Sequence, residues 1–426
     1  MLASVFAEDF KNGKYSDLLA SLYEDPSQVS YQEKRYADAL NKFIELYGDK
    51  EVSLFTAAGR SEVSGNHTDH QHGRVLAASI NLDSIGVAAK TDDGVIRVVS
   101  DEFNIAPVST DTLEPNPAEE GTSEALIRGV CSALAENDRA IGGFEAFITS
   151  DVLVGAGLSS SASFEVLIGT ILSGLYNNDE IDMVEIAKAS QVAENKFFGK
   201  PCGLMDQCAC AVGGLITIDF KDPSAPIVKS VDADFSEYGY SLCITDTKGS
   251  HADLTHEYAA IPEEMKQVAG FFGKDVLREV DEDEFESKIP EIRDAISDRA
   301  VLRAIHFFNE NNRVPAIVEA LENEDFAGFL DGIEASGNSS FKYLQNVYPS
   351  SDPTAQGVSV ALAVSENLLA DNDGVSRVHG GGFAGTIQAF VPNDAVEAYR
   401  QGMDAVFGEG SCHVLKIRAV GGKHLL

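Results

Sequence analysis

Positive charge is scarce in this sequence. The chain has 32 lysines and arginines and 68 aspartates and glutamates, which gives a formal net charge of −36 over 426 residues. So acidic a surface repels the phosphates of nucleic acids and the headgroups of anionic membranes, so we expect neither as a partner. We attribute the charge itself to solubility or to adaptation to a particular medium, and assign it no binding role.

Long apolar segments and dense cysteines are also missing. The N-terminus lacks a basic start followed by an apolar run, and no later stretch approaches membrane-spanning length. The six cysteines are scattered, unlike the framework of a small secreted domain. Cys202, Cys208 and Cys210 lie close together but lack the paired Cys-x-x-Cys spacing of zinc sites. The sequence therefore predicts a cytoplasmic protein with reduced thiols and no zinc site.

A third absence concerns nucleotide binding. A Walker loop needs Gly-Lys followed by Ser or Thr, but the four Gly-Lys pairs of this chain are followed by Tyr15, Pro201, Asp275 and His424. A dinucleotide fingerprint would require glycine or alanine where Ser160 stands, usually in an early strand–helix–strand unit. Any phosphate-binding loop in this chain is therefore of another type.

The order of the expected elements indicates an α+β protein of two domains, since 426 residues exceed one compact core. Residues 1–30 read as a polar, irregular extension, with an added helix or a surface for a partner as the alternatives. An amphipathic helix follows from Ser30 to Tyr47, and a strand from Glu51 to Ala58. We place the domain boundary near residue 218, which gives an N-terminal domain of residues 1–218 and a C-terminal domain of residues 219–426.

A loop rich in glycine and serine follows an expected strand at 144–154 and precedes an apolar helix at 163–176. Its sequence is Val154-Gly155-Ala156-Gly157-Leu158-Ser159-Ser160-Ser161. The glycines permit positive φ and a close approach of the backbone to a ligand. The N-terminus of the next helix presents free N–H groups and the positive end of its dipole, which suits nucleotide phosphates. A glycine turn with a serine cap is the purely structural alternative.

A second polar segment follows the first expected strand. Arg60, His67 and Asp69 supply the donors and acceptors that a polyhydroxylated ligand requires. The three histidines and one aspartate between residues 67 and 72 are also compatible with a metal site, although no further protein ligand is evident. A solvated polar turn is the remaining interpretation.

Acidic residues mark a third region. Glu194 lies on a partly apolar face of an expected helix at 181–197, and Asp206 lies in the turn Pro201-Cys202-Gly203-Leu204-Met205-Asp206-Gln207. An acid in such a turn can act as a general base or orient a hydroxyl, and Glu194 could hold Mg²⁺. Each acid alone is more often a cap or a surface charge. A last glycine run, at residues 379–386, could bring its backbone near the nucleotide phosphates at the glycine and serine loop, or it could form a hairpin.

Together these motifs resemble those of the GHMP kinases, and among them the galactokinases, in family order across residues 57–385. Residues 57–73 are similar to the family's sugar signature, 155–163 to its ATP loop and 380–385 to its third glycine motif. The Cys-Gly-x-x-Asp-Gln stretch matches as well. The resemblance implies an N-terminal domain of the ribosomal S5 domain 2 type and a ferredoxin-like C-terminal domain. It also implies a cleft between them that binds ATP, Mg²⁺ and a sugar.

The resemblance implies a role for each matching position. Asp206 would be the base or the orienting group for the sugar C1 hydroxyl, and Arg60 would stabilise charge on the transferring phosphoryl group. Ser161 and Glu194 would hold Mg²⁺. The ATP loop would comprise Gly155, Ala156, Gly157, Leu158, Ser159, Ser160 and Ser161. The sugar would be lined by Asn66, His67, Asp69, Gly203 and Tyr258, the last of these in a His-Glu-Tyr segment that lacks the arginines usually found after it.

Asn66 departs from the family pattern, in which a Glu within Gly-Glu-His-Thr-Asp faces the C6 hydroxyl. That Glu would repel a C6 carboxylate by about 4 kcal/mol at ~4 Å and an effective dielectric of about 20. Its absence admits a uronic acid, and plant galacturonokinases resemble this chain in lacking it and in reading Asp-His-Gln. An amide can still serve a hydroxyl. We therefore expect a galactokinase, with a kinase for galacturonate or for another modified galactose as the alternative.

A catalytically silent sensor of galactose and ATP is a second alternative, since such proteins belong to the family. The intact serine run from Ser159 to Ser163, together with Asp206 and Arg60, favours an enzyme. We expect only small molecules as partners, and a monomer or a weak homo-oligomer.

Overall fold

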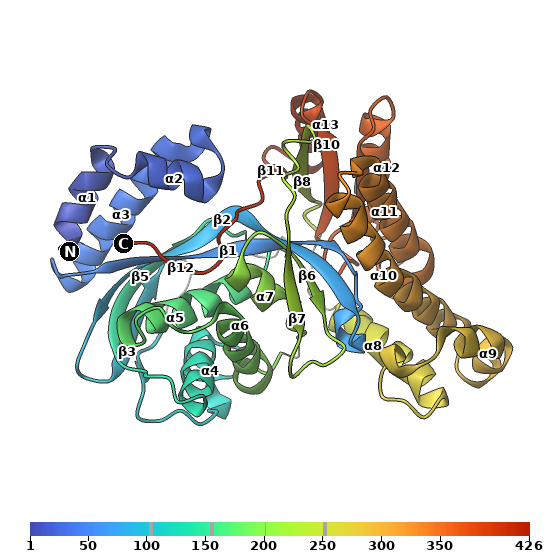
Figure 1. The fold of residues 1–426 in the computed structure, drawn as a ribbon, viewed down its shortest axis with the longest axis horizontal. Coiled ribbons are helices and arrows are strands. Elements are labelled where there is room, and N and C mark those ends of the chain that lie inside the picture. Colours follow the sequence, from blue (N-terminus) through green and yellow to red (C-terminus); the bar gives the residue numbers. More distant parts are fainter. Residues whose placement is uncertain (102–104, 154–156, 201, 250–253) are drawn as a thin grey trace.

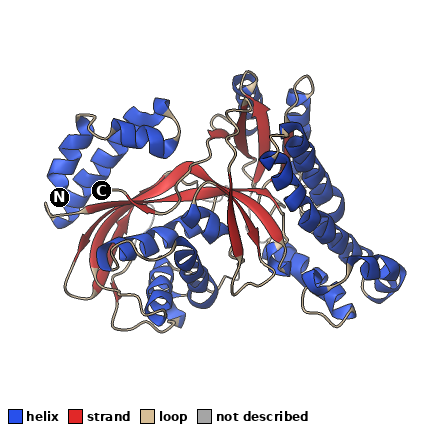
Figure 2. Ribbon diagram, in the orientation of Figure 1, coloured by secondary structure: helices blue, strands red, loops and turns tan. Residues whose placement is uncertain are grey.

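The computed structural model describes residues 1–426 except 102–104, 154–156, 201 and 250–253. Two β-sheets form its framework, and helices cover both (Figures 1 and 2). This arrangement confirms the α+β class. The helices are α1 (Ala3–Lys11), α2 (Ser16–Tyr23), α3 (Val29–Tyr47), α4 (Ser123–Glu136), α5 (Ser160–Tyr176), α6 (Met183–Val192), α7 (Met205–Val212), α8 (Thr255–Phe271), α9 (Glu282–Ala295), α10 (Asp298–Glu322), α11 (Phe326–Ser339), α12 (Gly357–Leu369) and α13 (Val396–Phe407).

The larger sheet carries most of the site. Its order is β12-β1-β2-β5-β3-β4, and β6 pairs with both β2 and β7. All described pairings are antiparallel except that of β3 with β5. The strands are β1 (Ser53–Ser64), β2 (Arg74–Lys90), β3 (Val95–Ser100), β4 (Val108–Ser109), β5 (Phe144–Ser150), β6 (Leu215–Asp219), β7 (Ile227–Val231) and β12 (Lys423–His424).

The central strands β1 and β2 of this sheet are buried along almost their whole length, because their side chains alternate between two helical layers. Phe55 and Ala57 point into a core with α4 to α7, whereas Leu54 points into a core with α1 to α3. Figure 1 shows the two layers on opposite sides of the sheet. The central strands are therefore held firmly, and the loops at their ends can position reactive groups.

The expectation of an irregular segment at 1–30 is wrong. Residues 3–11 and 16–23 form α1 and α2, which bury Phe6, Phe10 and Tyr23 against α3 and the sheet. Helices this short are marginal in isolation, so tertiary packing stabilises them. The expected helix at 30–47 is confirmed as α3, which ends at Gly48 with φ of +84°.

The smaller sheet has the order β11-β8-β10-β9 and carries α10 and α11 on one face and α12 and α13 on the other. Leu242 and Cys243, which are neighbours on β8, point into these two different cores. All its pairings are antiparallel. Its strands are β8 (Tyr240–Asp246), β9 (Val375–Val378), β10 (Thr386–Pro392) and β11 (Cys412–Leu415).

The chain crosses between the two sheets more than once. After residue 218, β7 still pairs with β6, and β12 near the C-terminus returns to pair with β1. Arg418 Nη1 and Arg35 Nη1 both donate to the buried carboxylate of Asp83, at 2.7 and 2.6 Å. The C-terminal segment and α3 are thus tied to the same strand of the larger sheet. Among the described residues, no helix is long and apolar enough to cross a membrane.

Candidate active site

Arg60 on β1 and Asp206 at the start of α7 form the centre of the candidate site. Arg60 Nε and Nη2 donate to Asp206 Oδ1 and Oδ2, each at 2.8 Å. Arg60 is only 6% exposed. Burial alone would raise the pKa of Asp206, but the charge of Arg60 and the hydrogen bonds from Arg60 and Ser159 together hold that pKa below its usual value. The pair therefore keeps an ionised carboxylate at the base of the site.

The described part of the glycine and serine loop contacts this pair directly. Arg60 Nη1 donates to the carbonyl of Gly157, and Ser159 Oγ donates to Asp206 Oδ2. Ser159 precedes α5 with φ of +58° and ψ of +58°, a conformation that non-glycine residues seldom adopt. Such backbone strain is typical of functional sites. Gly155 and Ala156 lie outside the described residues, while Gly157, Leu158, Ser159, Ser160 and Ser161 lie at the expected place before and within the first turn of α5.

Glu194 lies beside this loop, in a π-helical turn that spans Ala193–Phe198 and extends α6. Its carboxylate is 3% exposed, and Lys200 Nζ donates to Oε1 at 2.8 Å. Ser161 Oγ approaches the same oxygen at 3.4 Å, and Gln207 Nε2 donates to Oε2 at 2.8 Å. A hydroxyl and a carboxylate are oxygen ligands of the kind that Mg²⁺ binds, and a cationic group already lies at the carboxylate. The two expected metal ligands are thus adjacent and chemically suitable.

His67 and Asp69 lie in the loop between β1 and β2, where residues Asp69–Gln71 form one 3₁₀ turn. Asp69 Oδ1 accepts the backbone N–H of His70 at 2.8 Å. Burial and the nearby charge of Asp206 raise the pKa of Asp69 to about 6. A Cβ built on Gly203 would overlap Asp69 Oδ2, so glycine is required where the two loops meet. The sugar signature and the Asp206 turn are therefore in direct contact.

Tyr258 on α8 completes this side of the site from the C-terminal half of the chain. Its hydroxyl donates to the carbonyl of Gly382 at 2.8 Å, and its ring packs edge-on against Phe383. His67 Nε2 lies 3.0 Å from the carbonyl of Gly381, one residue earlier. Tyr258 and His67, which are 191 positions apart in the sequence, thus share the glycine segment 380–382.

The same glycine segment also reaches the phosphate loop. His379 lies between the two motifs, with Nε2 3.1 Å from Ser61 Oγ and Nδ1 2.9 Å from Thr386 Oγ1. A Cβ on Gly157 would come within 3.4 Å of His379 and within 3.3 Å of Thr386. The expectation that residues 379–386 approach the phosphate loop agrees with this geometry.

Asn66 is buried, whereas His67 and Asp69 in the same loop are half-buried. Its side chain is 0% exposed, and Nδ2 donates to Glu62 Oε1 at 3.0 Å and to the Gly380 carbonyl at 2.7 Å. Its Oδ1 accepts from Asn346 Nδ2 at 2.9 Å and Ser340 Oγ at 3.2 Å. All its hydrogen-bonding capacity is used inside the protein. Asn66 therefore anchors the sugar signature to the C-terminal half of the chain.

A cavity of about 400 Å³ opens beside Ser160 and Ser161 in the first turn of α5. Its walls combine apolar groups with several hydroxyls. Cavities of this size and composition suit a drug-sized organic ligand. It is lined by Ser84, Ser100, Gly121, Thr122, Ser123, Glu124, Leu126, Ile148, Ser150, Phe164 and Phe198, together with the two loop serines.

Three residues at the site were not predicted from the sequence. Lys200 pairs with Glu194, and Gln207 connects Glu194 to the buried Glu165. Burial and the charge of Glu194 raise the pKa of Glu165 well above its ordinary value. Two of these residues could have been found from the sequence. Gln207 follows Asp206 in the Cys-Gly-x-x-Asp-Gln motif, and Glu165 is an acid within a largely apolar helix. No sequence pattern indicated that Lys200 pairs with Glu194.

Comparisons with known proteins agree with this geometry. The model of the GHMP kinases N terminal domain matches residues 125–214, and the galactokinase galactose-binding signature matches residues 41–90. A galactokinase of Glaesserella parasuis is 33% identical over 368 residues, which cover 84% of this chain and 90% of that protein. A galactokinase of Streptomyces coelicolor is 28% identical and covers 86% of this chain and 91% of its own length.

Solved structures give the same result. The structure of Lactococcus lactis galactokinase complexed with galactose superposes with a TM-score of 0.76 at 26% identity, covering 90% of this chain and 98% of that one. Methanococcus jannaschii mevalonate kinase, at 15% identity and a TM-score of 0.60, covers 86% of this chain and 98% of its own and shares the fold. The two-domain fold expected from the sequence is confirmed. With its signature, its sequence relatives and its fold in agreement, the chain belongs to the galactokinase family of the GHMP kinases.

Proposed function

We propose that this protein transfers the γ-phosphoryl group of ATP to the C1 hydroxyl of galactose. The observation that carries the proposal is the position of the Arg60–Asp206 pair. Arg60 contacts the phosphate loop at Gly157, and the Asp206 turn contacts the sugar signature through Gly203 and Asp69. A sugar held at Asp69 and a phosphate held at the loop would therefore meet at this pair.

ATP would occupy the loop and the cavity beside it. The N-terminus of α5 offers its free N–H groups to the phosphates, and the cavity of about 400 Å³ next to Ser160 and Ser161 suits the nucleoside. Phe164 and Phe198 in its wall supply apolar and aromatic surface for the base. The loop and the cavity together support ATP as the phosphoryl donor.

Ser161 and Glu194 would hold Mg²⁺ with the phosphates. When bound, the ion would neutralise charge on the phosphoryl group that is transferred. Lys200 lies against Glu194 Oε1 through a side chain that is 62% exposed, and it would turn toward solvent when the ion binds. The charge on Glu194 is therefore balanced both with and without the metal.

Asp206 and Arg60 would divide the chemistry between them. The depressed pKa of Asp206 keeps it ionised at neutral pH, but it also makes the carboxylate a weak base. Asp206 would therefore orient the C1 hydroxyl and accept its proton late, as the new P–O bond forms. Arg60, always charged, would stabilise the charge that develops on the phosphoryl oxygens.

Asn66 offers no group that would bind a C6 carboxylate. The two hydrogens of its amide nitrogen are engaged by Glu62 and the Gly380 carbonyl, so the amide has no donor left for a C6 carboxylate. The acidic Glu62 lies immediately behind it, in an ion pair with Arg377. A uronate would thus gain no cationic partner at this position, whereas a neutral hydroxyl needs none.

A panel of sugars tests the proposal. ADP release with Mg²⁺ and ATP would be measured for galactose, galacturonate, N-acetylgalactosamine and no sugar. We expect kcat/KM for galactose to exceed that for galacturonate by about tenfold or more. A higher value for galacturonate would establish the uronate kinase instead. Tight sugar binding without turnover of any sugar would establish a sensor.

A further inference from the structure

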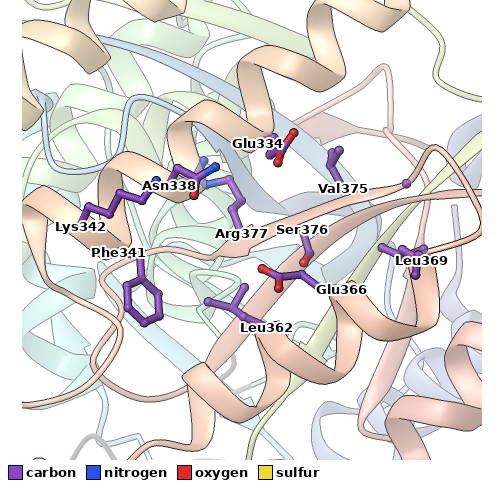
Figure 3. Close-up of a pocket in the computed structure, with 13 residues that line it drawn as sticks. Glu334, Asn338, Phe341, Lys342, Leu362, Glu366, Leu369, Val375, Ser376 and Arg377 are labelled. Atoms are coloured by element: carbon purple, nitrogen blue, oxygen red, sulfur yellow. The ribbon is translucent and has the colours of Figure 1, made fainter.

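A second cavity lies in the C-terminal half of the chain, between the edge strand β9 and the helices α11 and α12. Its volume is about 530 Å³ (Figure 3). We propose that it is a second, non-catalytic binding site for a neutral monosaccharide. It is lined by Glu334, Gly337, Asn338, Phe341, Lys342, Leu362, Glu366, Leu369, Ala370, Gly374, Val375, Ser376 and Arg377.

Four polar side chains around this cavity have no partner among the residues that the structure describes. Glu334, Asn338, Lys342 and Glu366 are exposed, and none forms a hydrogen bond or ion pair with another residue that the structure describes. Figure 3 shows Glu334 and Asn338 on one helix and Glu366 on another, on either side of the strand that carries Ser376. Unengaged side chains around a hollow are available to a ligand.

Two buried groups at the strand also lack partners. Arg377 is 0% exposed, and its Nε has no hydrogen-bond partner within the described part of the chain; the same is true of the buried Oγ of Ser376. Leaving such buried groups unpaired is unfavourable. Both residues line the cavity, so their unpaired atoms lie close to any ligand bound there.

Strand β9 adds backbone groups to the same wall. His379 donates to the Thr386 carbonyl at 3.1 Å, and β9 pairs antiparallel with β10. Because alternate residues bond across an antiparallel pair, Arg377 faces Gln388 in a bonded pair, and the N–H and C=O of Ser376 point to the open edge. These groups lie where a polar ligand beside the strand would meet them.

The charges around the cavity select the class of ligand. The side chains without a partner carry two negative charges, on Glu334 and Glu366, and one positive charge, on Lys342. The charge of Arg377 is already balanced by its ion pair with Glu62. Because the unpaired carboxylates outnumber the ammonium at this cavity, the local charge disfavours an anion such as a phosphate. A neutral polyol instead finds acceptors in the carboxylates and donors in Asn338 and Lys342. Phe341, 43% exposed, offers a surface for its C–H face.

The cavity is connected to the catalytic site through a short series of contacts. Arg377 Nη2 donates to Glu62 Oε1 at 2.7 Å, and Asn66 Nδ2 donates to the same oxygen at 3.0 Å. Asn66 directly precedes His67 in the sugar signature. A sugar at Arg377 would therefore lie two polar contacts from the loop proposed to bind the substrate, which gives the second site a route to influence it.

Hydrogen exchange with mass spectrometry tests the proposal on the wild-type chain, with galactose in large excess and no ATP. The inference rests on the proposed function only in its choice of galactose as the probe. We expect galactose to slow hydrogen exchange in two places. One is residues 61–73 of the sugar signature, and the other is the cavity segments at 334–342 and 362–377. Protection of 61–73 reports the proposed substrate, and protection of the cavity segments reports the second site, so the two fail separately.

Variants separate direct binding from an effect transmitted through the protein. Phe341→Ala with Glu366→Gln should abolish the protection at the cavity and leave that at 61–73. Both side chains are exposed, so the fold should persist. The control pair, Phe271→Ala and Asp331→Asn, removes an equally exposed aromatic ring and an acid on α11 that does not line the cavity; it should retain both effects. No protection at the cavity in the wild type, or protection that persists in the cavity variant, would overturn the proposal.

Discussion

Arg60 and Asp206 meet through two parallel N–H···O bonds of 2.8 Å each, although 146 positions separate them in the sequence. This bidentate geometry depends on the planar guanidinium group of arginine, which lysine lacks. The same bond pair joins β1, which carries the sugar signature, to α7, which carries Asp206.

Replacing Arg60 with Lys should lower kcat by about a hundredfold or more, since a donor aimed at the developing charge is lost. Galactose affinity, measured by calorimetry, should change far less. Arg139→Lys is the matched control, because Arg139 makes the same two-pronged contact with Glu185 on the surface. Equal kcat values for Arg60→Lys and Arg139→Lys would show that Arg60 does not take part in the chemical step.

Replacing Gly203 with Ala should weaken galactose binding strongly, because the added Cβ overlaps the carboxylate of Asp69 and displaces it. Binding would be followed by calorimetry and folding by circular dichroism. Gly270→Ala serves as the control, because a Cβ at Gly270, within α8, meets no other atom within 4 Å. Unchanged affinity in Gly203→Ala would contradict the assignment of Asp69 to the sugar.

The pH dependence of sugar binding should follow Asp69. Its pKa is raised to about 6, so Asp69 gains a proton as the pH falls through that value. A carboxylate accepts hydroxyl hydrogen bonds more strongly than a carboxylic acid does, so affinity should fall toward acid, by up to about tenfold per pH unit below the pKa. Asp69→Asn should bind more weakly at neutral pH and lose this dependence. An affinity that is flat between about pH 5 and about pH 8 in the wild type would count against the assignment.

Replacing Asn66 with Glu should destabilise the protein. The new carboxylate would lie against that of Glu62, and two such charges about 4 Å apart repel by about 4 kcal/mol at an effective dielectric of about 20. The free energy of unfolding in urea should fall accordingly. Adding Glu62→Gln should restore much of the loss, because one charge is removed. A single variant as stable as the wild type would show that the two side chains do not interact.

Much of the site could be predicted from local sequence. The strand before Arg60, the glycine and serine loop before α5, and the turn that holds Asp206 are each specified by neighbouring residues with known conformational preferences. The order of these motifs then indicated the fold. The extent of α3 followed from its apolar stripe and from Gly48.

The remaining contacts depend on residues distant in sequence, which no local pattern specifies. Arg377 reaches Glu62 across 315 positions, and Asn346 reaches Asn66 across 280. These contacts turn Asn66 inward, whereas the motif alone suggested a ligand-facing side chain. Helices α1 and α2 were missed for a related reason, because neither has a side-chain cap and both depend on burial against α3 and the sheet.

The most direct test of the central claim compares galactose phosphorylation by the wild type and by Asp206→Asn, with ³¹P NMR to identify the product and calorimetry to measure galactose affinity. We expect the wild type to form galactose 1-phosphate. The variant should show a kcat lower by about a thousandfold with nearly unchanged affinity, because the amide cannot accept the proton of the C1 hydroxyl. A near-normal rate in Asp206→Asn, or phosphate at a position other than C1 in the wild type, would contradict the account.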